Sequence, residues 1–151
     1  MKYNKTKFLI FKQMDKQISL KITTDITNLP DVLSWFEQIN QPPIARQEIW
    51  WKCQTILIEG FTNIVEHAHK TLSEETPINI EAFRSDKFIE IRIFSQGEPF
   101  NIEQKLQEIA EFEENHQERG RGLKIMSILA DKLSYEQVSE NCYCLFMSKT
   151  Y

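Results

Sequence analysis

Apolar and polar residues alternate near the start of the chain in a way that predicts two β-strands. Residues 8–11 are a short apolar run, and residues 18–22 alternate strictly between apolar and polar side chains. Strict alternation is typical of a strand with one buried face. We expect the two strands to pair antiparallel within residues 5–23, at a sheet edge or in a contact between two copies of the chain.

Apolar residues three and four positions apart predict two helices in the next part of the chain. The first helix covers residues 30–39, and the pair Pro42–Pro43 stops it. The second covers residues 45–70 and has the longest periodic pattern of the sequence. Its apolar stripe consists of Ile49, Trp50, Cys53, Ile56, Leu57, Phe61, Ile64, Val65 and Ala68.

The remaining pattern predicts further strands and helices and, with them, the fold class. In chain order these are strands over 78–82 and 88–94, helices over 102–112 and from Gly120 onward, and a hairpin of strands over 134–138 and 142–148. This order predicts an α+β, two-layer sandwich with helices on one face of a mixed, mostly antiparallel sheet. No linker or internal repeat interrupts the pattern, so we expect a single domain over residues 1–151.

Composition and charge restrict the classes of protein that fit. The chain has 151 residues, of which 41% are hydrophobic, 26% are charged and only four are glycine, which excludes disordered and collagen-like chains. A net charge of −4 offers no broad basic surface for nucleic acid or an anionic membrane. No apolar run approaches the roughly 18 residues of a membrane span, and the apolar run at 8–11 is too short for a secretion signal.

The three cysteines indicate a reducing compartment, and we expect a cytoplasmic protein. An odd number this small does not form a disulfide framework. Cys142 and Cys144 are two residues apart on a predicted strand and therefore share a face. Burial in the core is the favoured interpretation, and a metal site is the alternative.

Polar residues that carry chemistry lie at three places along the chain. Glu59, Asn63 and His67 are four residues apart, so they stack on the helix face opposite the apolar stripe. Such a row is usually just the solvated side of a helix. Two glycine turns follow it, at residues 95–100 after a strand and at residues 119–123 at a helix start. A helix start with glycine favours phosphate binding, because free N–H groups and the helix dipole attract its charge.

The motifs of the common nucleotide folds are missing from the sequence. No G-x-G-x-x-G follows a strand, and no G-x-x-x-x-G-K-[ST] occurs. The Rossmann and P-loop classes therefore lack their phosphate-binding loop. Any phosphate site has to be built from the two glycine turns.

These three motifs together resemble those of the GHKL-type (Bergerat-fold) ATPases, and within them the anti-sigma factor serine kinases of the RsbW and SpoIIAB kind. Residues 58–68 resemble the asparagine box, E-x-x-x-N followed by H-A. Residues 94–101 resemble the first glycine box, D-x-G-x-P-F-D, and residues 120–131 the second. The resemblance covers nearly the whole chain and implies a Bergerat fold.

The resemblance implies a role for each matching residue. Asn63 would coordinate Mg²⁺ through its amide oxygen, and Glu59 would be the general base of phosphoryl transfer. Gly97 would let the chain turn beneath the adenine, whereas Gly120 and Gly122 would close over the phosphates. The residues that would contact ATP are Asn63, Ser95, Gly97, Arg119, Gly120, Arg121, Gly122 and Leu123.

The sequence departs from the family pattern at the adenine contact. Ser95 stands where the family has an aspartate that accepts a hydrogen bond from the adenine amino group. Loss of that bond costs about 1–3 kcal/mol, or tenfold or more in affinity. Asn101 and Arg119 also depart from the pattern, and the segment between the glycine turns is rich in glutamate, at residues 103, 108, 111, 113, 114 and 118.

Three functions therefore remain open. The first is an ATP- and Mg²⁺-dependent serine kinase that phosphorylates a STAS-domain anti-sigma antagonist and sequesters a sigma factor. The second is a non-catalytic partner-switching module of the same fold with weakened or lost nucleotide binding, and the third is an unrelated structural domain. The resemblance also implies a homodimer, and because Trp50 and Trp51 cannot both face the core, one of them is a candidate for its interface.

Overall fold

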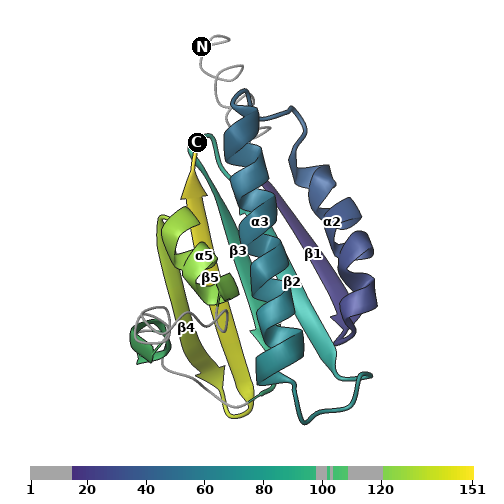
Figure 1. Cartoon of the computed structure of the whole chain (residues 1–151). Coiled ribbons are helices and arrows are strands. Elements are labelled where there is room, and N and C mark those ends of the chain that lie inside the picture. Colours follow the sequence, from purple (N-terminus) through teal and green to yellow (C-terminus); the bar gives the residue numbers. More distant parts are fainter. Residues whose placement is uncertain (1–14, 98–101, 103, 109–120) are drawn as a thin grey trace.

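The sheet has five strands in the order β1-β2-β3-β5-β4, and each neighbouring pair is antiparallel (Figure 1). The computed structural model describes residues 15–97, 102, 104–108 and 121–151. Within them the strands are β1 (Lys16–Thr23), β2 (Pro77–Arg84), β3 (Phe88–Ser95), β4 (Lys132–Ser139) and β5 (Cys142–Thr150). The predicted strands at 18–22, 78–82, 88–94 and in the closing hairpin are thereby confirmed.

The described helices cover one face of this sheet, as the sequence predicts (Figure 1). They are α2 (Leu29–Phe36), continued by a 3₁₀ turn to Ile39, then α3 (Gln47–Asn63) and α5 (Arg121–Leu129). Residues 104–108 are also helical. The α+β sandwich with helices on one face is therefore confirmed, with every described strand pair antiparallel.

The core lies between the helices and the sheet because β2 and β3 alternate strictly between buried and more exposed side chains. Ile80, Ile91 and Ile93 are fully buried on the helix side, and α3 packs Phe61 against the same core. A Cβ at Gly60 would lie 2.8 Å from Cε of Met147. Glycine at this position therefore lets α3 approach the sheet closely.

Two features differ from the sequence-based prediction. β1 pairs with β2, with Leu20 opposite Ile80, whereas its expected partner at 8–11 lies outside the described residues. The long helix does not continue as an α-helix to residue 70. It ends at Asn63 and continues as the π-helical segment η3 (Ile64–Ala68), because the amide of His69 donates to the carbonyl of Ile64 at 2.8 Å.

The other face of the sheet carries no described helix and holds the two neighbouring cysteines. Cys142 and Cys144 do share a face, but Cys144 lies beside Arg92 and Phe146 in a pocket of this helix-free face. The favoured burial is confirmed for Cys144, which is 8% exposed, whereas Cys142 is only partly buried. Alternation tells which residues share a face and not which face the helices cover. Burial raises the pKa of the Cys144 thiol to about 11, which keeps it protonated.

No helix in the described part of the chain is both long and apolar enough to cross a membrane.

Candidate functional site

The candidate site consists of Glu59, Asn63, Ser95, Gly97 and Gly122, which come from α3, the end of β3 and the start of α5. Asn63 lies one helical turn after Glu59 and is the last residue of α3. Its Nδ2 atom is buried and makes no hydrogen bond within the described residues. A buried N–H donor without a partner is costly unless a ligand accepts a hydrogen bond from it. The amide oxygen of the same side chain is the kind of ligand that Mg²⁺ takes. The side chain therefore fits the predicted role at a metal ion.

The Glu59 carboxylate lies against the first turn of α5. A Cβ built on Gly122 would clash with Oε2 of Glu59, so only glycine leaves room for the carboxylate there. Burial and the nearby charge of Glu66 raise the pKa of Glu59, and Arg121 partly opposes this shift. A carboxylate with a raised pKa is a stronger base, which suits proton abstraction.

The first glycine turn is attached to the end of the asparagine-box helix. Gly97 packs against the backbone of Ala68, and a Cβ there would lie 2.7 Å from the carbonyl carbon of Ala68. The amide of Gln96 donates to Nε2 of His69 at 3.0 Å. Close packing, and not a left-handed backbone, is therefore what requires glycine at position 97. Together the two contacts connect β3 to η3.

Ser95 lies on the helix side of the sheet, at the end of β3. It is 2% exposed, and Oγ makes no hydrogen bond of good geometry among the described residues. Its polar neighbour is the hydroxyl of Tyr135, and burial raises the pKa of Tyr135 more than the interaction with Ser95 lowers it. The Tyr135 ring stacks on Tyr143, with centroids 5.8 Å apart. The position predicted to contact adenine thus ends in hydroxyl groups and not in a carboxylate.

The other predicted site residues are placed as follows. Arg121 lies at the first position of α5. The side chain of Leu123 is 6% exposed and packs in the core, so only its backbone is available to a ligand. His67 is exposed on η3. Arg119 and Gly120 lie outside the described residues.

Sequence reasoning missed two residues that shape the site. His69 is 2% exposed, and burial lowers its pKa, so it is neutral with Nε2 accepting from Gln96. Its position directly after the H-A motif is the one signal in the sequence. Tyr135 belongs to no sequence motif, and only its place on the helix side of β4 brings it near Ser95.

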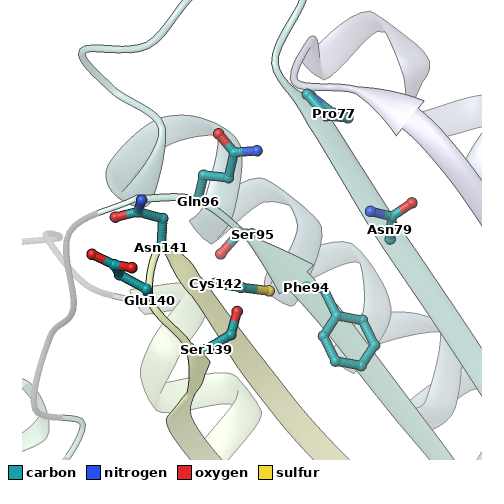
Figure 2. Close-up of a pocket in the computed structure, with 9 residues that line it drawn as sticks. All are labelled: Pro77, Asn79, Phe94, Ser95, Gln96, Ser139, Glu140, Asn141 and Cys142. Carbon is teal, nitrogen blue, oxygen red and sulfur yellow. The ribbon is translucent and has the colours of Figure 1, made fainter.

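A pocket of about 380 Å³ lies on the helix-free side of the sheet, near the β4–β5 turn (Figure 2). Asn79 and Phe94 line it from β2 and β3, and both belong to the alternate positions that face away from the helices. Glu59 lies on the opposite side of the sheet. Ser95, at the end of β3, also lines the pocket, so the pocket adjoins the candidate site at this residue.

The fold and the site together define a class of protein. The described site has an acid and an amide one turn apart on α3, with Gly122 against the acid and Gly97 against the helical segment that follows. On a helix-covered antiparallel sheet, this is the arrangement that the motif resemblance implies for an ATPase domain. The family profile described as "Histidine kinase-like ATPase domain" matches residues 22–149. The chain therefore belongs to the histidine kinase-like ATPase domain family, which confirms the predicted superfamily. A comparison with curated proteins gives no match.

Proposed function

We propose that the protein is an ATP- and Mg²⁺-dependent protein-serine kinase that phosphorylates a STAS-domain anti-sigma antagonist and sequesters a sigma factor. The observation that carries the proposal is the Glu59 carboxylate, held one turn from Asn63 and against Gly122 at the start of α5. A domain that only bound nucleotide would not need a carboxylate with a raised pKa beside the phosphate position. The named partners rest on the sequence resemblance.

The residues divide the work of the transfer between them. Glu59 accepts the proton of the serine hydroxyl as its oxygen bonds to the γ-phosphorus and the bond to the leaving ADP breaks. Asn63 would hold Mg²⁺ through its amide oxygen. Bound Mg²⁺ supplies charge neutralisation at the nucleotide phosphates. Gly122 leaves the carboxylate room beside the first turn of α5, where Arg121 adds positive charge. Ser95 and Gly97 lie at the end of the site that would hold the adenine base.

Glu59→Gln tests the kinase directly, with labelled ATP, Mg²⁺ and a panel of STAS-domain proteins. We expect the native protein to label one of them on serine and the variant to be slower by about a hundredfold or more, the usual contribution of a general base. Glu48→Gln makes the same change at the exposed other end of α3 and should retain the native rate. Absence of transfer to every candidate, with the native protein folded, would contradict the proposal.

Ser95 favours a second candidate function, a partner-switching module of the same fold that does not transfer phosphate. A buried hydroxyl in place of the aspartate weakens adenine binding. The module would then have to bind its protein partners without a bound nucleotide. Calorimetry of ATP with Mg²⁺ separates the two functions. Millimolar affinity supports the binding module, whereas micromolar or tighter affinity excludes it as a general account.

A further inference from the structure

The end of the candidate site that would hold the purine base carries hydroxyl groups from β3 and β4, the two strands on either side of β5. Ser95 pairs in register with Tyr143, and Tyr143 stacks on Tyr135 with an angle of 4° between the rings. The Tyr135 hydroxyl lies beside Ser95, whose Oγ is buried without a well-formed hydrogen bond in the described part of the chain. Ser95 therefore keeps capacity to bond a ligand from a buried position.

A hydroxyl and a carboxylate recognise different purines. An ionised carboxylate only accepts hydrogen bonds, whereas a hydroxyl rotates and either donates or accepts. Adenine presents an amino donor at position 6, and guanine and hypoxanthine present a carbonyl acceptor there. A carboxylate at this place selects the amino group and repels the carbonyl. A serine hydroxyl can pair with both.

The surroundings of Ser95 support the conclusion that its hydroxyl can pair with either an amino or a carbonyl group. Burial raises the pKa of Tyr135, so its hydroxyl stays protonated and neutral at physiological pH. The stacked ring of Tyr143 limits the freedom of the Tyr135 ring to turn away. The pair therefore presents no fixed negative charge to the base.

We propose that the Ser95–Tyr135 hydroxyl pair makes the nucleotide site tolerant at position 6 of the purine, so that 6-oxopurine triphosphates bind about as well as ATP. This inference rests on the proposed function, since it concerns the end of the same site that would hold the purine base. The substrate class becomes purine nucleoside triphosphates and not ATP alone.

Binding of ATP and of inosine triphosphate, each with Mg²⁺, tests the inference by calorimetry on the full chain. Inosine triphosphate carries the 6-oxo group without the 2-amino group of GTP, so the comparison isolates position 6. We expect the two dissociation constants of the native protein to agree within about threefold. A preference for ATP of about thirtyfold or more would overturn the inference and leave the proposed function standing.

Ser95→Asp is the informative variant, because it restores an acceptor-only group. We expect it to raise the preference for ATP to about tenfold or more, mainly through loss of inosine triphosphate. Ser34→Asp adds the same charge at an exposed position of α2 and should keep the native ratio. An unchanged ratio in a folded Ser95→Asp protein would also overturn the inference. Lack of binding of either nucleotide, up to millimolar concentration, would instead refute the proposed function.

Discussion

At the residue scale, the candidate site depends as much on absent side chains as on present ones. In the proposed mechanism Glu59 and Asn63 supply the chemistry, but the space that the Glu59 carboxylate occupies exists because residue 122 has no Cβ. A methyl group there would meet the flexible end of a side chain and not the backbone. The fold can therefore accept a side chain at position 122 if the Glu59 carboxylate moves. The proposed proton transfer cannot, because it needs the carboxylate in its present place.

Gly122→Ala should separate activity from stability. We expect phosphoryl transfer to fall by about tenfold or more, because the Glu59 carboxylate is displaced from its place by α5. The free energy of unfolding should change by less than about 1 kcal/mol, since alanine also favours the helix. Rates with a saturating antagonist and urea unfolding measure the two effects. A variant with full activity would show that the position of Glu59 against α5 is not needed.

The place of a residue in the site could be predicted from the sequence where the residue belongs to a motif. It could not be predicted where it depends on a contact with a residue far away in the chain. Glu59, Asn63 and Gly122 stand in motifs, and the structure brings Glu59 and Gly122 together. His69 was missed because its role depends on Gln96, which lies 27 residues later in the chain. The serine at position 95 was recognised as a departure, but its neighbour Tyr135 lies on another strand.

At the element scale, the connection between η3 and the end of β3 fixes the strand end that carries Ser95, the residue predicted to contact adenine. The His69–Gln96 hydrogen bond and the packing of Gly97 on Ala68 are its described contacts. The strands were predictable because alternation reports one buried face directly. The π-helical turn was not, since Ile64 and Ala68 keep an apolar spacing that an α-helix would also have. Such turns are frequent at functional sites.

The stability of this connection should depend on pH through His69. Burial lowers its pKa below the value near 6.5 of an unfolded chain. Below about pH 6.5 the unfolded chain binds a proton that the folded protein does not, so the free energy of unfolding falls as the pH is lowered. His69→Gln should make this decrease shallower in urea titrations between pH 7 and 5.

The exposed neighbour provides the control for that experiment. His67→Gln makes the same substitution two residues earlier, where the side chain is exposed on η3. It should leave the pH dependence of unfolding as in the native protein. If both variants behave alike, the buried histidine does not govern the acid sensitivity of the domain.

At the scale of the whole molecule, we propose that the protein is a homodimer with Trp51 in the interface. Trp50 is 5% exposed and stacks on Phe36 with centroids 4.7 Å apart, whereas Trp51 is 57% exposed. The two residues thus divide between core and surface, as their adjacency predicts. A large exposed aromatic side chain is typical of a protein interface.

Light scattering at tens of micromolar should give the mass of two chains, and Trp51→Glu should reduce it to that of one. Val138→Glu introduces the same charge at another exposed apolar residue, on β4, and should leave the dimer intact. A monomeric native protein would refute the dimer. A dimeric Trp51→Glu protein would place the interface elsewhere.

The contacts of three glycines also bear on how substitutions are tolerated across the domain. A side chain at Gly97 meets the backbone of Ala68 and should fail a selection for folding alone. One at Gly60 meets the ends of the buried Met147 and Ile93 side chains, so it should be tolerated only as far as these two can move. Gly122 should pass that selection and fail only one for function. Subtracting the two tolerance maps of a saturation library would therefore trace the proposed phosphoryl-transfer centre without a bound nucleotide or a known partner.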